Sequence, residues 1–330
     1  MLNIPDKIHI ANLPTKIEKL ERFSKELNGP NIYIKRDDYT GSEISGNKVR
    51  KLEFSVKEAI DKNCNTLITC GGIQSNHCRA TAAIAAKLGL KCFLVLRGSD
   101  TNSYDGNLFL DKLLGANIKF ISPEDYKFNR IEIMESIKEN LIKDGLKPYI
   151  IPEGASNGIG SFGYFLAMDE IAKQEEELEL RFDHIVLSVG SGGTYAGLLL
   201  CNKYLNHHSK VWGINICDDK DYFKNRIYNI LGDCANYLDI PVDLSINDIN
   251  IIDGYVGKGY ALSSPVELDF IKKLAKLEGI ILDPVYTGKA MYGLQEEIKK
   301  GLFKKGENVL FIHTGGLFGL FPQKDYIEFI

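Results

Sequence analysis

The chain has 330 residues, 44% hydrophobic and 25% charged, which is the composition of an ordinary globular protein and a length that suits two lobes. Its 40 basic and 44 acidic residues give a formal charge of −4 and are dispersed, so we expect no nucleic-acid partner. No apolar run reaches the roughly 20 residues of a membrane span, and the first residues lack a signal-peptide pattern, so we expect a cytoplasmic protein without a membrane partner.

Seven short apolar segments are predicted to form buried parallel strands. They alternate with segments of helical period, such as 49–60, where Val49, Leu52 and Val56 fall on one stripe. This alternation predicts an α/β fold with mostly parallel sheets covered by helices. In chain order, the strands are expected at residues 66–70, 91–97, 117–121, 148–152, 184–190, 210–217 and 308–314.

The domain organisation is predicted from the number of strands and the absence of a linker. Seven strands exceed one compact sheet of usual size, and no Pro/Gly/Ser-rich stretch separates two halves. We therefore expect one lobe inserted in the other. The charge-rich segment 173–181 is interpreted as a solvated helix end. Seven cysteines without a CxxC pair and six histidines without HExxH spacing predict neither a disulfide framework nor a metal site.

The glycine-rich segment 190–194 follows a strongly apolar predicted strand and precedes a predicted helix. Small residues let backbone N–H groups approach an anion, and the helix adds its positive end, so this segment is a candidate phosphate site. Walker A and dinucleotide patterns both fail here, which favours a single phosphate. The alternative is a tight turn without a ligand.

Two further segments carry candidate functional side chains. Lys48 lies in SGNKVRK at a predicted loop-to-helix junction, where an exposed amine could form a Schiff base, and Lys51 lies one turn further on. A second ammonium there could favour neutral Lys48 and also meet a phosphate. The segment 71–77 opens another predicted helix, where Ser75 and Asn76 could hold a carboxylate or simply cap the helix. His77 beside them is ambiguous.

Hydroxyl groups in two segments nearer the C-terminus are the last candidate functional groups. Tyr286 and Thr287 lie in DPVYTGK, and Thr314 lies in HTGG. A heteroaromatic cofactor needs a partner for its ring nitrogen, and these loops offer hydroxyls. One lysine, a phosphate site, a carboxylate site and hydroxyl ring partners together suggest pyridoxal 5′-phosphate (PLP) acting on a small amino-acid substrate.

Five motifs, in this order along the chain, carry a resemblance over roughly residues 5–320. They are SGNKVRKLE, CGGIQSNHCRA, VGSGGTYAGL, LDPVYTGKAM and HTGG. With them the chain resembles the family of D-cysteine desulfhydrases and 1-aminocyclopropane-1-carboxylate (ACC) deaminases, which are PLP enzymes of the tryptophan-synthase-β-like fold, or fold type II. The resemblance implies a homodimer with a larger PLP-binding domain at residues 1–50 and 160–330 and a smaller domain at 51–159.

The resemblance also implies roles for individual residues. Lys48 would carry the cofactor as a Schiff base and, with Ser75 and Tyr286, form the catalytic group. Asn76 would meet the 3-hydroxyl of PLP. The substrate would contact Ser75, Asn76, His77, Tyr260 and Tyr286. The remaining cofactor contacts would be Lys51, Gly190, Ser191, Gly192, Gly193, Thr194, Thr287 and Thr314.

Two positions bear on the substrate. ACC deaminases typically have DPVYEGK and HLGG, whereas this chain has Thr287 and Thr314, as in the desulfhydrase branch. A hydroxyl partner makes the ring a weaker electron sink, which suffices when a good leaving group departs from Cβ. The sequence therefore favours α,β-elimination by a lyase that converts D-cysteine to pyruvate, hydrogen sulfide and ammonia. The alternatives are ACC deamination, elimination from L-cysteine, cysteate or 3-chloroalanine, and a non-catalytic PLP-binding protein.

Overall fold

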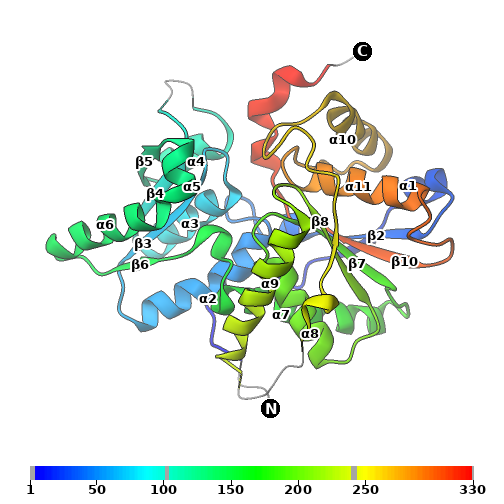
Figure 1. Cartoon of the computed structure of the whole chain (residues 1–330), viewed down its shortest axis with the longest axis horizontal. Coiled ribbons are helices and arrows are strands. Elements are labelled where there is room, and N and C mark those ends of the chain that lie inside the picture. Colours follow the sequence, from blue (N-terminus) through cyan, green and yellow to red (C-terminus); the bar gives the residue numbers. More distant parts are fainter. Residues whose placement is uncertain (1–3, 101–103, 239–243, 329–330) are drawn as a thin grey trace.

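The computed structural model describes residues 4–100, 104–238 and 244–328 and has two lobes, each built on one sheet (Figure 1). The larger sheet has the order β1-β2-β10-β7-β8-β9, and only β1 runs antiparallel to its neighbour. The smaller sheet has the order β5-β4-β3-β6 and is parallel throughout. The strands are β1 Ile17–Lys19, β2 Asn31–Lys35, β3 Thr66–Gly72, β4 Lys91–Arg97, β5 Asn117–Ile121, β6 Pro148–Ile150, β7 His184–Val189, β8 Lys210–Asn215, β9 Asn250–Ile252 and β10 Asn308–Ile312.

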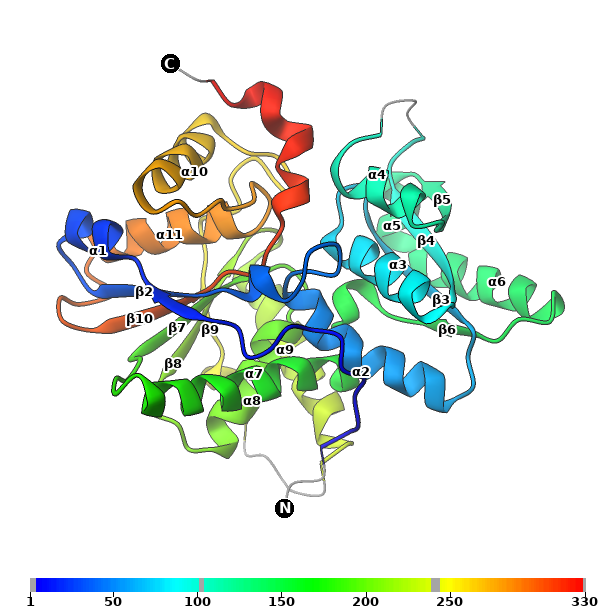
Figure 2. The same ribbon diagram turned by 180° about the vertical axis from the view of Figure 1, so that it is seen from behind.

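Helices cover both faces of each sheet, as parallel sheets require (Figures 1 and 2). On the larger sheet, α7, α8 and α9 pack on one face and α1, α10 and α11 on the other. On the smaller sheet, α2 and α3 share one core and α5 and α6 the other. The helices are α1 Glu21–Leu27, α2 Asn47–Asp61, α3 Asn76–Leu88, α4 Gly106–Leu113, α5 Pro123–Phe128, α6 Arg130–Lys143, α7 Gly158–Glu177, α8 Gly193–Tyr204, α9 Lys220–Ala235, α10 Pro265–Glu278 and α11 Thr287–Lys299, with short 3₁₀ turns η1 Asp37–Tyr39, η2 Glu153–Ala155, η3 Ile246–Asp248, η4 Leu317–Gly319 and η5 Phe321–Tyr326.

The smaller lobe is inserted in the larger one, as the sequence predicts. All four of its strands fall between β2 and β7 along the chain. Helix α2 joins the lobes, because its apolar stripe belongs to the core of the smaller lobe while its backbone lies against α7. A Cβ at Gly163 of α7 would lie 2.3 Å from the Arg50 carbonyl oxygen, so this close approach requires glycine. The domain boundaries at residues 50 and 160 stay a prediction.

All seven predicted strands are present, and the helix expected over 49–60 is α2. The sequence analysis did not identify β1, β2 and β9. β1 and β9 have three residues each, too few for a periodic pattern, and β2 has five. Among the described helices, none is long and apolar enough to cross a membrane.

Candidate active site

A cavity lies where both lobes contribute the ends of strands and the starts of helices. The larger lobe contributes the β7–α8 loop, the strand end at Thr314 and two tyrosines, and the smaller lobe contributes the β3–α3 loop and η2. This position beyond the carboxyl ends of parallel strands is the usual ligand site of open α/β sheets. The wall consists of Asn47, Lys48, Gly71, Gly72, Ser75, Asn76, His77, Glu153, Gly154, Ser188, Val189, Gly190, Ser191, Gly192, Thr194, Tyr195, Tyr260, Tyr286 and Thr314.

Lys48 is the second residue of α2 and faces this cavity. The helix start is fixed by Gly46, whose φ of 87° favours glycine and where a Cβ would lie 2.6 Å from the Thr314 carbonyl oxygen. The same oxygen accepts a hydrogen bond from Asn47 N at 3.1 Å. The end of β10 thereby fixes the first turn of α2 against the larger sheet.

The amine of Lys48 is partly buried rather than exposed on a loop as expected. Burial lowers its pKa to about 8, while the charge of Glu153 acts in the opposite direction. Lys51 is not among the causes of this shift, so the expected help from a second ammonium is not what lowers the pKa of Lys48. Instead, Lys48 affects Lys51: the pKa of Lys51 is lowered well below its usual value by burial and then by the charges of Lys48 and Arg226.

Lys51 lies directly behind the glycine-rich β7–α8 loop. Its Nζ donates to Ser156 Oγ at 2.7 Å, and a Cβ at Gly193 would lie 2.7 Å from that Nζ. Ser156 Oγ also accepts from Gly193 N at 3.3 Å and shares a hydrogen bond with Ser191 Oγ at 2.7 Å. Among the ion pairs of the described residues, none neutralises Lys51, which is 0% exposed. A buried cation beside a side-chain-free loop at a helix start fits an anion such as phosphate.

The start of α3 contributes three side chains to the wall. Ser75 caps the helix, because its Oγ accepts from Cys78 N at 3.2 Å. His77 Nε2 lies 2.8 Å from Thr69 Oγ1, and that hydroxyl donates to the Ile151 carbonyl oxygen, so Nε2 carries the ring proton. The buried Nδ1 then has no partner among the described residues. Burial, followed by the nearby lysines, lowers the pKa of His77 well below its usual value, so the ring is neutral.

Tyr260 and Tyr286 meet across the cavity with their hydroxyl oxygens 2.5 Å apart. Burial raises the pKa of both phenols, so both are protonated at neutral pH. Asp283 orients Tyr286 by accepting its backbone N–H at 2.9 Å. Lys289 holds the segment that carries Tyr260, because its Nζ donates to the carbonyl oxygens of Val256 at 2.7 Å, Gly259 at 2.8 Å and Leu262 at 3.1 Å.

Eleven of the predicted site residues line the cavity, and Lys51, Gly193 and Thr287 do not. Lys51 and Gly193 lie immediately behind the wall. Thr287 is a different case: its hydroxyl donates to Asp283 Oδ1 at 2.6 Å and accepts from Asp283 N at 2.8 Å. Both interactions are internal to the α11 start, so the structure does not bring this hydroxyl to the cavity. Of the two predicted ring partners, Thr314 is the one on the wall.

Glu153, Ser156 and Arg226 have polar contacts at the site and were missed by the sequence analysis. Glu153 lines the cavity and accepts from Tyr126 Oη at 2.6 Å. Ser156 connects Lys51 to the β7–α8 loop, and Arg226 of α9 donates from Nε to the Ser191 carbonyl oxygen at 2.9 Å. The PEGAS segment carrying Glu153 and Ser156 follows the 148–152 strand, so the strand-end rule applied to the other four loops would have found it.

A buried ion network supports α2 from below. Arg50 donates to both oxygens of Asp37, at 3.0 and 2.9 Å, and to both oxygens of Glu170, at 2.9 and 3.0 Å. Burial acts to raise the pKa of Asp37, but the charges of Arg50 and Lys35 outweigh it and the pKa is lowered. Arg50 lies two residues after Lys48, so the network fixes the helix that presents the amine.

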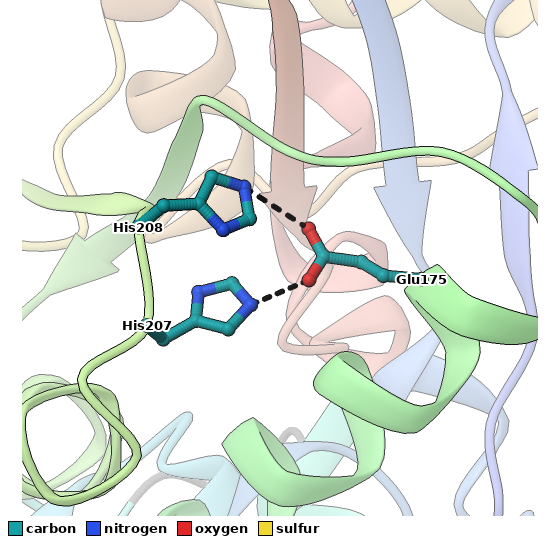
Figure 3. A group of neighbouring side chains, drawn as sticks. All are labelled: Glu175, His207 and His208. Carbon is teal, nitrogen blue, oxygen red and sulfur yellow. Dashed lines mark hydrogen bonds and ion pairs between the residues drawn. The ribbon is translucent and has the colours of Figure 1, made fainter.

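A separate group lies at the C-terminal end of α7, where Glu175 faces His207 and His208 (Figure 3). Glu175 was expected on a solvated helix end, but it is buried. Ser209 N donates to His207 Nδ1 at 3.3 Å, so His207 Nε2 carries the proton and donates to Glu175 Oε2 at 2.5 Å. Glu175 Oε1 accepts from Phe182 N at 2.5 Å. These hydrogen bonds explain the buried carboxylate as a connection between α7, the segment before β7 and the α8–β8 loop.

The fold and the cavity define a class of enzyme. A family model described as "Pyridoxal-phosphate dependent enzyme" matches residues 8–315, and the chain belongs to this family. It is thus a PLP-dependent enzyme of fold type II, as the motifs indicated.

The names of similar proteins within the family indicate the kind of reaction. The chain is 45% identical to the bifunctional D-cysteine desulfhydrase/1-aminocyclopropane-1-carboxylate deaminase, mitochondrial, of Arabidopsis thaliana, over 96% of this chain and 79% of that protein. It is 46% identical to a putative 1-aminocyclopropane-1-carboxylate deaminase of Thermotoga maritima, over 96% and 98% of the two chains. A solved structure titled as that of an ACC deaminase homologue superposes with a TM-score of 0.90 at 39% identity, covering 98% of this chain and 95% of that one. Elimination or deamination of a small amino acid is the chemistry these names share.

Proposed function

We propose that Lys48 binds PLP covalently and that the enzyme catalyses α,β-elimination from D-cysteine. The observation that carries the proposal is the pairing of a partly buried amine, with a pKa of about 8, and an anion site backed by buried Lys51 at one cavity. An amine of lowered pKa is neutral often enough to attack an aldehyde, and the anion site suits the phosphate of the same cofactor.

The cofactor contacts follow from the donors in the wall. Backbone N–H groups of residues 190–194 would hold the phosphate, with Lys51 supplying charge from behind the loop. Asn76 would donate to the ring oxygen, and the Thr314 hydroxyl would meet the ring nitrogen. A hydroxyl does not protonate that nitrogen, which favours substrates with a good leaving group at Cβ.

The proton transfers are assigned to groups that face the cavity. Bound PLP withdraws electrons from an amino acid joined to it and so acidifies the Cα–H bond. Lys48 Nζ, once released from the cofactor, would accept that proton, and Ser75 Oγ would bind the substrate carboxylate at the start of α3. The Tyr260–Tyr286 pair holds its protons at neutral pH, so Tyr286 Oη would act as the donor toward the departing sulfur. The overall reaction consumes D-cysteine and water and yields pyruvate, hydrogen sulfide and ammonia.

Opening of ACC is the second candidate, and the names of the relatives favour it at least as strongly. The Arabidopsis relative carries both activities in its name. The cavity wall offers the same amine and the same phenol pair for ring opening. Elimination from L-cysteine, cysteate or 3-chloroalanine would use the same groups. We further propose a homodimer, because the five motifs resemble those of a family in which homodimers are usual.

A substrate panel tests the proposal. Purified holoenzyme is assayed in parallel with D-cysteine, L-cysteine, cysteate, 3-chloroalanine and ACC, measuring sulfide together with the keto acid. We expect sulfide and pyruvate in equal amounts from D-cysteine, and a loss of about tenfold or more in Ser75→Ala, the size of one hydrogen bond to a charged group. Turnover of ACC alone would transfer the assignment to the deaminase. Bound PLP without turnover of any substrate would identify a non-catalytic PLP-binding protein.

A further inference from the structure

Asn107, at the start of α4, contacts Asn76 in the cavity wall and Arg79 in the interior of the smaller lobe. Its side chain is 0% exposed. Its Nδ2 donates to Asn76 Oδ1 and to the Gln74 carbonyl oxygen, each at 3.0 Å. Its Oδ1 accepts from Arg79 Nε at 3.2 Å. Asn107 lies outside the cavity wall, so its effect on the site is transmitted through Asn76.

Arg79 determines which way the amides of Asn107 and Asn76 point in this series of hydrogen bonds. A guanidinium group only donates, so the amide oxygen of Asn107 must face it. The amide nitrogen of Asn107 then faces Gln74 and Asn76, and the Gln74 carbonyl, which only accepts, requires the same orientation. Asn76 must therefore present its oxygen to Asn107 and its nitrogen to the opposite side. Among the described residues, no protein acceptor takes a hydrogen bond from Asn76 Nδ2, and Asn76 lines the cavity.

We propose that Arg79 and Asn107 are positioning residues that hold the Asn76 amide with its N–H donor, and not its oxygen, toward the cofactor. The proposal rests on the proposed function, because it requires PLP in the cavity. A donor at this place stabilises the ring oxygen of PLP as an anion, whereas an amide oxygen there would repel it. Arg79 also donates to the carbonyl oxygens of Glu43 and Ser45, which connects this chain of hydrogen bonds to the segment before Lys48.

The test reverses the orientation without changing the size of the side chain. In Asn107→Asp, the carboxylate still pairs with Arg79 but offers only acceptors. It loses the hydrogen bond to the Gln74 carbonyl oxygen, and the Asn76 amide must turn to donate to it. Its oxygen then faces the cofactor. The PLP form that retains its ring-hydroxyl proton absorbs in the near ultraviolet, and the form that has lost it absorbs in the visible. We expect the ratio of visible to near-ultraviolet absorbance of the holoenzyme to fall by about tenfold, the size of one hydrogen bond to a charged group.

The matched control is Asn202→Asp at the far end of α8. Asn202 is likewise buried, and its Nδ2 donates to the Ser209 carbonyl oxygen at 2.9 Å. This variant should lose stability without a change in the absorbance ratio. If Asn107→Asp does not fold, Asn107→Ala gives the second measurement. It removes the donor without forcing Asn76 to turn, and a smaller change in the same direction is expected.

The outcomes separate this inference from the proposed function. If the wild-type protein binds PLP and the visible band depends on Lys48, but the folded Asn107 variant keeps the wild-type ratio, then Asn107 does not orient Asn76 and the inference is overturned. An equal change in Asn202→Asp also overturns it, because the effect would then follow general destabilisation. A wild-type protein without any Lys48-dependent band refutes the proposed function itself.

Discussion

Replacing Arg50 by methionine should destabilise the protein strongly, because it removes the cation between buried Asp37 and partly buried Glu170 and leaves Lys35 alone to offset their charges. Arg50 is 2% exposed and Asp37 is 0% exposed, and Arg50 supplies two of the hydrogen bonds that Asp37 accepts. Among the described residues, the remaining donors to the Asp37 carboxylate are the hydroxyl groups of Thr15 and Tyr164. Breaking a buried ion pair costs about 3–5 kcal/mol, and at about 1.4 °C per kcal/mol for a chain of 330 residues the Tm should fall by roughly 4–7 °C.

Thermal unfolding of the apoprotein is the assay, and Arg22→Met is the control. Arg22 is an exposed arginine whose Nε lies 3.7 Å from Glu278, so its loss should change stability by about 0.5 kcal/mol or less. Adding Asp37→Asn to Arg50→Met should recover part of the loss, because the orphaned charge is then absent. The reasoning is refuted if Arg50→Met costs no more than Arg22→Met, or if the second substitution adds a further loss instead.

The same network predicts a pH dependence. The pKa values of Asp37 and Glu170 are lowered in the folded protein, although burial alone would raise both. The stability they contribute is therefore present above the ordinary carboxyl pKa and is lost as the pH falls through the lowered values. Wild-type stability should decrease on acidification below about pH 4, and the decrease should be smaller in Arg50→Met.

Three further predictions concern the cofactor site. Gly193→Ala should weaken PLP binding in a titration by about tenfold or more, because the added Cβ would lie 2.9 Å from the backbone Cα of Ser156 and overpacking costs about 1–3 kcal/mol. Gly232→Ala, with nothing within 4 Å, should not weaken it, and equal affinities would contradict the packing. Glu153→Gln should lower the pKa of Lys48 below about 8 and move the pH midpoint of PLP capture by the apoprotein downward, and an upward movement would disprove the assigned sign. Thr287→Val should cost about 2 kcal/mol for its two hydrogen bonds with Asp283 and leave the PLP spectrum unchanged, and an altered spectrum would show that the hydroxyl reaches the ring after all.

Much of the larger architecture could be predicted because strands and the loops that follow them can be recognised from short continuous stretches of sequence. The buried strands are continuous apolar runs, and the glycine-rich and polar loops follow them at the strand ends, where ligands bind in this class of fold. Lys48, Asn76 and the 190–194 loop converge on one cavity although more than 100 residues separate the first from the last. The rule about strand ends places such loops together without any knowledge of the intervening chain.

What the sequence did not supply depends on contacts between distant segments. The burial of Lys48 and the absence of Thr287 from the wall follow from how α2 and the α11 start pack, and the motifs alone gave no sign of either. Glu175 lies in a run of charged residues that predicts a solvated helix end. Its burial depends on a hydrogen bond from His207, which lies in another loop. Asn107 has the sequence context of any helix start, and only the structure shows that it contacts Asn76.

The most direct test of the account is to locate the lysine that carries PLP. Borohydride reduction of the holoenzyme fixes the cofactor to its lysine, and mass spectrometry of the peptides identifies that residue. The account predicts one modified lysine, Lys48, and no modification of the Lys48→Ala variant. Modification of Lys51 or of a lysine outside the cavity would contradict it.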